Sequence, residues 1–366
     1  MQDVLVIGGG PAGIATAIAA SLKGLRVTVI DARKPPIDKP CGEGLLPAAV
    51  GAMRRLGVKL DSTLPFRFCG FHFSDRSSSI CAEIPAGDAF GVRRTVFHRL
   101  LIDRALDLGV NFVWGTRLVR LDSHGAETSA GFIRSRWIVG ADGSSSNVRR
   151  LAGLEPRRRA RYRFGFRRHF EIAPWTDRVE VHWGDRCQLV ITPTGFCEVC
   201  VSLFTSDASL RLNRALDAFP AVAGRFAGAQ PRSAEAGTVT MLRRARAVIR
   251  GNVALVGDAS CTVDGIAGQG LSLAFQQSIQ LADALVKGNL SPYAAAHARI
   301  ARIPVRVTRL LLAMNASSAL RRKALRLFAA KPGLFARMIS VHTGLASTGV
   351  LNAAELLNLG WQVAWA

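Results

Sequence analysis

Residues 3–31 read DVLVIGGGPAGIATAIAASLKGLRVTVID, and this stretch decides the fold. The β-branched run at its start predicts a strand, and the Ala-rich segment after the glycines predicts a helix to about Lys23. Residues 25–30 predict a second strand that ends in Asp31. A G-x-G-x-x-G turn between strand and helix, followed about 20 residues later by an acid, is the pattern of a dinucleotide-binding unit. We therefore expect an α/β fold that begins with a nucleotide site.

Each glycine of this turn has its own expected role. Gly8 turns the chain sharply, Gly10 lets the backbone approach a pyrophosphate, and Gly13 lets helix and strand pack closely. The helix start offers N–H groups and a positive dipole end to phosphates, and Asp31 would accept hydrogen bonds from ribose hydroxyls. The alternative is a turn that binds nothing. We do not expect a signal peptide or membrane span here, because residues 4–22 follow no basic segment and contain four glycines and a proline.

The composition bounds the class of protein. A chain of 366 residues is long enough for about two domains, and 49% hydrophobic with 20% charged residues is typical of a globular protein. The net charge of +22 favours anionic partners, such as acidic lipid, an acidic carrier protein or phosphorylated cofactors, although arginines that merely face solvent are the alternative. Nucleic-acid binding is not expected, because no nucleic-acid module is present and there are only two Tyr.

The cysteines indicate compartment and one candidate site. Seven Cys without a secretory signal predict reduced thiols and a cytoplasmic protein. Cys197 and Cys200 form a CxxC, but no second pair or suitably spaced His completes a zinc site, so no metal is predicted. Cys41 stands in KPCGEG, immediately before a helical pattern, where the backbone can lie against a flat ligand. Cys41 is therefore a site candidate, and an ordinary buried thiol beside a tight turn is the alternative.

Later segments carry residues of the kind that line a nucleotide site. They are two strand ends and two helix starts: Asp142 with Gly143, Gly257 with Asp258, Gln269 to Ser272, and Arg93 with Arg94. An aspartate at a strand end beside a helix N-terminus can bind a sugar hydroxyl and an electron-rich ring edge together. A guanidinium at a helix start can reach a phosphate or ribose, although an exposed arginine pair is the alternative.

The rest of the chain predicts a second sheet and a helical end. Residues 163–204 alternate polar and apolar side chains over several short runs, which predicts an antiparallel sheet inserted into the nucleotide unit. Residues 66–84 predict a hairpin. Residues 291–344 predict basic amphipathic helices broken by Pro304 and Pro332, with a buried leucine stripe that includes Leu310 and with arginines facing solvent.

Three motifs follow one another along the chain: the G-x-G-x-x-G turn with Asp31, then Asp142-Gly143, then Gly257-Asp258 followed by Gly-Gln-Gly at residues 268–270. In this order they resemble the motifs of the FAD-dependent group typified by para-hydroxybenzoate hydroxylase and the geranylgeranyl reductases, the group A flavoprotein monooxygenase-like proteins. The resemblance runs from Asp3 to about Lys287, and KPCGEG is similar to the Cys-Gly segment of the geranylgeranyl reductases. Two features depart from the family pattern: Gly265 replaces a Pro in the third motif, and Phe97-His98 replaces a Leu-Asp pair. The Trp-x-Trp-x-Ile-Pro segment and Lys motif of flavin halogenases are absent.

The resemblance implies a Rossmann-type FAD-binding domain with an inserted antiparallel-sheet substrate domain and C-terminal helices. The expected FAD-binding domain is discontinuous, comprising residues 1–65, 92–158 and 245–290. The expected substrate domain comprises residues 66–91 and 159–244, and residues 291–366 form a C-terminal helical region.

The resemblance also implies the site. The first motif would hold the ADP portion of FAD, the second would contact FAD and take part in NAD(P)H use, and the third would bind the ribityl and pyrophosphate region. The expected FAD-contacting residues are Gly8, Gly10, Pro11, Ala12, Gly13, Asp31, Ala32, Arg33, Cys41, Gly42, Gly44, Arg94, Asp142, Gly143, Gly257, Asp258, Gly268, Gln269, Gly270 and Leu271. Candidate substrate-contacting residues on the inserted sheet are His169, His182, Trp183 and Phe196, with Cys41 and His182 as candidate catalytic residues. The alternative for each is a packed sheet residue.

Three functions remain open at this point. The first choice is an FAD-dependent, NAD(P)H-consuming monooxygenase that hydroxylates an aromatic or polyketide-like small molecule. The second is a flavin-dependent reductase of isoprenoid double bonds, which would need FAD at the same motifs. A third, of another class, is a basic flavin-binding protein whose helices over residues 299–337 dock on an anionic membrane or an acidic carrier protein, although those helices could simply cover the core.

Overall fold

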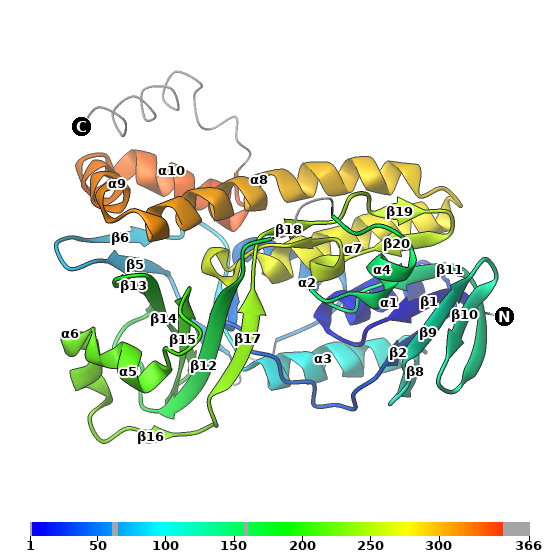
Figure 1. Cartoon of the computed structure of the whole chain (residues 1–366), viewed down its shortest axis with the longest axis horizontal. Helices are drawn as coiled ribbons and strands as arrows, with labels where there is room; N and C mark the ends of the chain where they lie inside the picture. Colours follow the sequence, from blue (N-terminus) through cyan, green and yellow to red (C-terminus); the bar gives the residue numbers. More distant parts are fainter. Residues whose placement is uncertain (1, 61–64, 157–159, 347–366) are drawn as a thin grey trace.

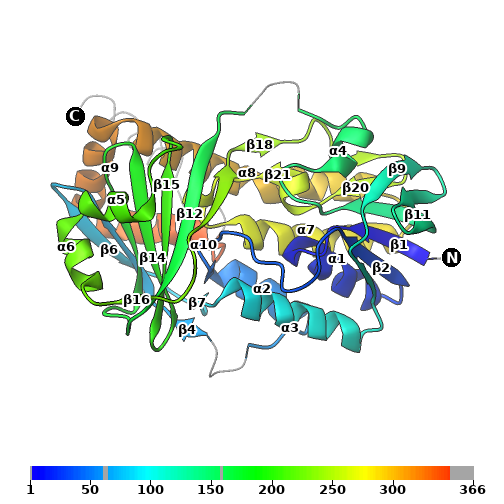
Figure 2. The same cartoon turned by 60° about the horizontal axis from the view of Figure 1, so that its bottom comes forward.

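The computed structural model describes residues 2–60, 65–156 and 160–346. Its two large sheets lie at opposite ends of the long axis (Figures 1 and 2). The first is parallel apart from its edge and a hairpin. In order, its strands are β19 (Ile249–Arg250), β20 (Val253–Leu255), β11 (Gly131–Gly140), β1 (Gln2–Ile7), β2 (Val27–Asp31) and β8 (Asn111–Trp114); β9 (Leu118–Asp122) and β10 (Gly125–Thr128) extend β11.

Helices cover both faces of this parallel sheet because its central strands are apolar on both sides. One face packs on α1 (Pro11–Ser21), α3 (Arg94–Asp107) and α7 (Gly270–Val286), with α2 (Pro47–Arg55) against α7. Phe97 and Phe275 are both buried in this core, with ring centroids 5.9 Å apart. The other face is covered by α4 (Asn147–Leu151) and the β9–β10 hairpin. The parallel sheet and the helix after its Gly-rich turn confirm the predicted α/β fold.

The second sheet, which we call the substrate sheet, is mostly antiparallel, as predicted for residues 163–204. In order, its strands are β16 (Gln230–Pro231), β12 (Arg163–Glu171), β15 (Glu198–Thr205), β14 (Cys187–Gly195), β13 (Arg178–Trp183), β5 (Gly70–Ser74) and β6 (Ser79–Glu83), and β17 (Ala236–Thr240) pairs with β12. The hairpin expected in residues 66–84 is β5–β6, and it joins this sheet through a parallel pairing of β5 with β13.

Short elements complete the two halves. The outer face of the substrate sheet carries α5 (Leu212–Asp217), α6 (Pro220–Ala223) and the 3₁₀ turn Gly224–Phe226. Small sheets form from β3 (Gly44–Leu45), β7 (Phe90–Gly91) and β4 (Phe66–Arg67), and from β18 (Arg243–Arg244) and β21 (Cys261–Thr262). Two further 3₁₀ turns, Gly257–Ala259 and Gly265–Ala267, precede α7.

Three C-terminal helices cover the inner face of the substrate sheet: α8 (Ser291–Ala316), α9 (Ser318–Ala330) and α10 (Pro332–Thr343). The predicted break at Pro332 is found, but the break predicted at Pro304 is wrong. Helix α8 continues through Pro304, because its buried face runs on through Val305 and Thr308, whose hydroxyl donates to the Pro304 carbonyl at 2.7 Å. Residues 347–366 of the expected helical region lie outside the described residues.

Two side chains of these helices differ from the expected pattern. Leu310 is 40% exposed instead of buried. Arg321 is buried instead of solvent-facing, because it donates to the Met314 carbonyl at 3.1 Å and lies 3.5 Å from Asp75. In the described part of the chain, every helix falls short of the combination of length and apolar character that crossing a membrane requires.

Candidate active site

Backbone atoms leave no room for side chains at two glycines of the Gly-rich turn, Gly8 and Gly13. Gly8 has φ of 116°, and a Cβ there would lie 2.4 Å from the Ala141 carbonyl oxygen. A Cβ on Gly13 would lie 1.8 Å from the Gly8 carbonyl oxygen, so α1 packs directly on the turn. A Cβ on Gly10 would meet nothing within 4 Å. The turn is therefore tight toward the sheet and open on the side of Gly10, which is the shape a pyrophosphate requires.

Two side chains hold this turn in place. Asp31, at the end of β2, accepts the Gly9 N–H at 2.8 Å and the Arg33 N–H at 2.8 Å. His98 of α3 lies with Nε2 2.7 Å from the Gly9 carbonyl oxygen. Burial lowers the pKa of His98, so a neutral ring that donates its Nε2–H to Gly9 fits both observations. The sequence did not predict this role, although His98 was noted as a departure from the family's Leu-Asp pair.

One cavity of about 880 Å³ joins the three motifs. All the expected FAD-contacting residues line it except Gly13, which packs behind the turn. Arg94, at the start of α3, lines the cavity too, and its Nε atom is buried with no hydrogen-bond partner among the described residues. An orphaned guanidinium nitrogen beside an open Gly10 cradle fits an anionic dinucleotide.

The other two motifs shape the cavity wall. Asp142 caps α4, accepting hydrogen bonds from the Ser146 hydroxyl and from the Asn147 and Val148 N–H groups at 2.7 and 3.1 Å. Burial raises the pKa of Asp142. Asp258 pairs with Lys39 at 3.2 Å. Asp142 thus uses its carboxylate for the local fold, whereas Asp258 also contacts the loop that carries Cys41.

The N-terminus of α7 borders the same cavity. Gly268 has φ of 63°, which ends the preceding 3₁₀ turn, and the helix begins two residues later at Gly270. Gln269 and Leu271 also line the cavity. The unpaired N–H groups of a helix start stabilise negative charge, such as that of an anionic flavin ring.

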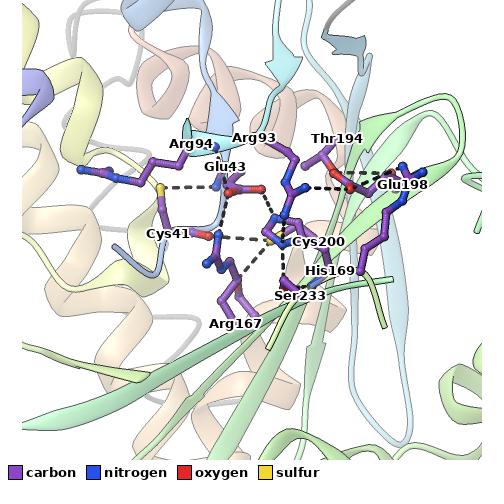
Figure 3. A network of polar contacts seen from close by, with 12 residues as sticks. Cys41, Glu43, Arg93, Arg94, Arg167, His169, Thr194, Glu198, Cys200 and Ser233 are labelled. Atoms are coloured by element: carbon purple, nitrogen blue, oxygen red, sulfur yellow. Dashed lines mark hydrogen bonds and ion pairs between the residues drawn. The ribbon is translucent and has the colours of Figure 1, made fainter. Parts of the chain in front are cut away.

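A buried polar network surrounds Glu43 (Figure 3). The Glu43 backbone is left-handed, with φ of 58°, and its carboxylate is fully buried. One oxygen accepts from the Arg94 N–H and from Arg167 Nη1, both at 3.0 Å, and the other lies 2.6 Å from His169 Nε2. Arg167 also donates to Asp38 at 2.8 Å. Glu43 therefore ties the Cys41–Gly44 loop to both α3 and β12 of the substrate sheet.

Cys41 is held by the same network. Its sulfur accepts the Glu43 N–H at 3.4 Å, and its carbonyl accepts the Cys200 thiol at 3.7 Å. Of the cysteines in the described ranges, Cys41 alone lines the cavity.

The donor atoms of Glu43, His169 and Cys200 lie within 4.8 Å of one another, but they do not fit a metal ion. Both oxygens of Glu43 are already engaged, one by the Arg167 cation at 3.0 Å and the other by His169 at 2.6 Å. Burial raises the pKa of Cys200 well above its ordinary value, which disfavours the thiolate that a metal requires. The cluster is an ion-pair network.

Beyond the network the cavity becomes apolar. We call this part the apolar chamber. It lies between strands β5, β13 and β14 and helices α8 to α10, and its walls are Phe71, Phe73, Val179, Val181, Trp183, Val190, Val307, Leu310, Leu311, Met314, Leu325, Phe328, Phe335, Met338, Ile339 and His342. Phe73 stacks on Trp183, with centroids 5.7 Å apart. None of these residues carries a formal charge at neutral pH, since burial lowers the pKa of His342 to about 4.

The four candidate substrate residues are not brought together. Trp183 lines the cavity, whereas His169 is bound within the Glu43 network. His182 faces the opposite side of β13, where its Nδ1 lies 2.7 Å from the Ser74 hydroxyl, so a catalytic role for His182 does not fit its placement. Phe196 is 69% exposed in the β14–β15 turn, against Phe66. Side chains alternate along a strand, and the alternation alone did not reveal which face is inward.

The comparisons with known proteins agree with this geometry. A profile of the FAD binding domain family matches residues 1–199, and the chain belongs to this family. It is an FAD-dependent oxidoreductase. Menaquinone reductase of Mycolicibacterium smegmatis is 27% identical over 80% of this chain and 78% of that protein. The 3-(3-hydroxy-phenyl)propionate/3-hydroxycinnamic acid hydroxylase of Mycobacterium sp. strain JLS is 31% identical over 42% of this chain and 29% of that protein.

Solved structures share the fold. A flavoprotein/dehydrogenase from Cytophaga hutchinsonii superposes with a TM-score of 0.79 at 19% identity, covering 94% of this chain and 93% of that one. A geranylgeranyl bacteriochlorophyll reductase-like protein from Thermoplasma acidophilum superposes with a TM-score of 0.72 at 20% identity, covering 85% of this chain and 87% of that one. A probable FAD-dependent monooxygenase from Pseudomonas aeruginosa superposes with a TM-score of 0.71 at 21% identity, covering 86% of this chain and 96% of that one. Because these three differ in chemistry, the shared fold does not define the reaction.

Proposed function

We propose that this protein reduces a carbon–carbon double bond in a long apolar molecule of the isoprenoid type, with NAD(P)H as the source of electrons. The observation that carries the proposal is the apolar chamber, which is continuous with the cavity at the three FAD motifs. Bound FAD, once reduced, supplies the hydride for such a reaction.

The chamber suits a hydrocarbon chain. Glu43 and Arg167 border the cavity outside the chamber walls, and Arg167 is ion-paired with Asp38 and Glu43. Burying an aliphatic chain is favourable by about 0.8 kcal/mol per methylene, whereas a charged substrate would lose its hydration without gaining a partner here. The lack of charge on the chamber walls therefore favours an apolar substrate.

The relatives support the same class of substrate. Menaquinone reductase, whose name states that it reduces menaquinone, aligns over most of this chain, and so the alignment includes more than the matched FAD domain. The KPCGEG segment, similar to that of the geranylgeranyl reductases, forms the loop that Glu43 holds against the cavity.

In this proposal Cys41 is the catalytic residue that contacts the substrate. Reduction of a double bond adds a hydride and a proton, and a thiol can donate the proton. The backbone and Glu43 keep the sulfur in place, so the loss of Cys41 should slow turnover without releasing FAD. Cys41→Ser and Cys41→Ala, compared with the exposed Cys81→Ala, test this role.

Product mass tests the reaction. The purified protein is incubated with FAD, NAD(P)H and a polyprenyl substrate, and the product is analysed by mass spectrometry. A gain of two hydrogens supports the proposal. A gain of one oxygen would instead identify a hydroxylase.

Hydroxylation of an aromatic or polyketide-like molecule is the second candidate. The stacked Phe73 and Trp183 favour it, because aromatic walls also bind flat aromatic rings, and the named hydroxylases align with part of the chain. Hydroxylation requires that label from ¹⁸O₂ enter the product, whereas double-bond reduction leaves the product unlabelled.

A further inference from the structure

Helix α8 carries a stripe of four exposed arginines, which we call the basic stripe: Arg299, Arg302, Arg306 and Arg309. Their spacing places all four on one side of the helix, opposite the buried Ala301, Val305 and Thr308. Residues 291–343 contain no Asp or Glu. Within the described ranges, none of the four arginines has an acidic partner.

The stripe borders the mouth of the apolar chamber. Leu310 follows Arg306 by one helical turn and is 40% exposed, yet it also lines the cavity together with Val307 and Leu311. An apolar side chain that belongs to both the surface and the cavity wall marks an opening. Helix α8 runs along one edge of the molecule, with α9 and α10 beside it over the substrate sheet (Figure 1).

The neighbouring helix adds to the charge. Arg322 and Arg326 of α9 are also exposed, and Phe328 on the same helix lines the chamber. Helices α8 and α9 thus present cations outward and apolar side chains inward, over the space assigned above to an apolar substrate.

We propose that α8 and α9 dock on a bilayer that carries anionic lipid, and that the apolar chamber opens toward that bilayer beside Leu310. Charge complementarity supplies the attraction, because arginines near an anionic leaflet bind lipid headgroups. The inference rests on the proposed function in one respect: a long isoprenoid chain partitions into the bilayer, and a docked mouth lets it enter the chamber without crossing water.

A bilayer explains the combination of features better than an acidic protein. An acidic carrier would satisfy the arginines, but it offers no reason for an apolar opening among them. An anionic bilayer accounts for both the arginines and the apolar opening, because its headgroups can bind the basic stripe and its acyl chains can contact Leu310.

Vesicle sedimentation of the full chain loaded with FAD tests the proposal without any turnover. Vesicles of phosphatidylglycerol mixed with phosphatidylcholine are compared with pure phosphatidylcholine, at about 50 mM and about 500 mM NaCl. We expect sedimentation with the anionic vesicles at low salt and release at high salt. Failure to sediment under the first condition overturns the proposal and leaves the stripe to an acidic protein.

Charge reversal locates the contact. The triple variant Arg302→Glu, Arg306→Glu, Arg309→Glu should bind the anionic vesicles at least about tenfold more weakly. The matched control is Arg55→Glu, Arg134→Glu, Arg214→Glu, three exposed arginines on α2, β11 and α5 with the same change in net charge. An equal loss of vesicle binding in the two variants would mean that only the net charge determines binding, and would contradict the proposed docking surface.

The outcomes separate this inference from the proposed function. If the product assay finds no double-bond reduction but the basic stripe still mediates vesicle binding, the docking proposal is supported and the proposed function is wrong. If reduction occurs and neither vesicle type sediments the protein, the chamber fills by another route and the docking surface is wrong.

Discussion

His169 Nε2 lies 2.6 Å from the Glu43 carboxylate, and both side chains are fully buried. The Nδ1 atom of His169 lies 3.0 Å from the Ser233 hydroxyl and 3.2 Å from Arg93 Nη2, so a ring that donates from Nε2 and accepts at Nδ1 satisfies every neighbour. This pair joins the loop that carries Cys41 to a strand of the substrate sheet. One carboxylate therefore connects the Cys41 loop, which lines the cavity, to both α3 and β12.

Replacing the Glu43 carboxylate should lower both the stability of the protein and its affinity for FAD. In Glu43→Gln the buried Arg167 keeps its charge but loses one anionic partner, and the expected cost is about 3 kcal/mol in the free energy of unfolding. FAD should also bind more weakly, because the Cys41–Gly44 loop lines its cavity. Urea unfolding and FAD titration measure the two effects. Glu127→Gln, an exposed member of the Arg120 pair, is the control and should change neither; unaltered FAD affinity in Glu43→Gln would refute the positioning role.

A methyl group on Gly13 should abolish the nucleotide turn. Its Cβ would lie 1.8 Å from the Gly8 carbonyl, so α1 must move away from the sheet, at a cost of about 3 kcal/mol. The Gly13→Ala protein should be purified without FAD and with a lowered Tm. Gly51→Ala in α2 is the matched control, since a Cβ there meets nothing within 4 Å and alanine favours a helix. Retention of FAD by Gly13→Ala would count against the packing described here.

His297 should make stability depend on pH. It is buried in α8 with Nε2 2.9 Å from the Ser260 hydroxyl, and burial lowers its pKa to about 4. Between an unfolded pKa of about 6.5 and that value, the unfolded state binds a proton that the folded state does not, so stability falls as the pH falls. The effect of this group is at most on the order of 3 kcal/mol. Urea midpoints measured from about pH 7 down to about pH 4 should fall less steeply in His297→Gln than in the parent; parallel curves would contradict the assignment.

Filling the chamber should change substrate length preference. Leu311→Trp adds bulk to the chamber wall on α8, so KM for a long polyprenyl substrate should rise roughly tenfold while a short one is affected less. Leu106→Trp, at an exposed position of α3, is the control. An equal change for both chain lengths would show that the chain does not occupy this chamber.

Local patterns predicted the parts of the fold that depend on neighbours in sequence. The strand, Gly-rich turn and helix of residues 3–31 were predictable because the positive φ of Gly8 is a local backbone property and Gly13 packs on the Gly8 carbonyl, five residues away. The break at Pro304 was wrong because burial of Val305 and Thr308 outweighs one missing helix hydrogen bond.

The site needed contacts that no local pattern carries. Glu43 and His169 are separated by 126 residues, so their pairing could not be read from the sequence. His182 and Trp183 were both expected to contact substrate because the strands of residues 163–204 should floor the pocket, but neighbours in a strand face opposite ways. There Glu180 receives the contacts of His182 and His72, which lower its pKa well below the ordinary value although burial alone would raise it. That cluster stabilises the outer face of the sheet.

The most direct test of double-bond reduction is an anaerobic single turnover. The FAD-loaded protein is reduced, mixed with a polyprenyl substrate in the absence of oxygen, and followed by the visible absorbance of oxidised flavin. Our account predicts that the flavin absorbance returns with substrate alone and that the product gains two hydrogens. Absorbance that returns only after oxygen is admitted, with one oxygen atom in the product, would contradict it.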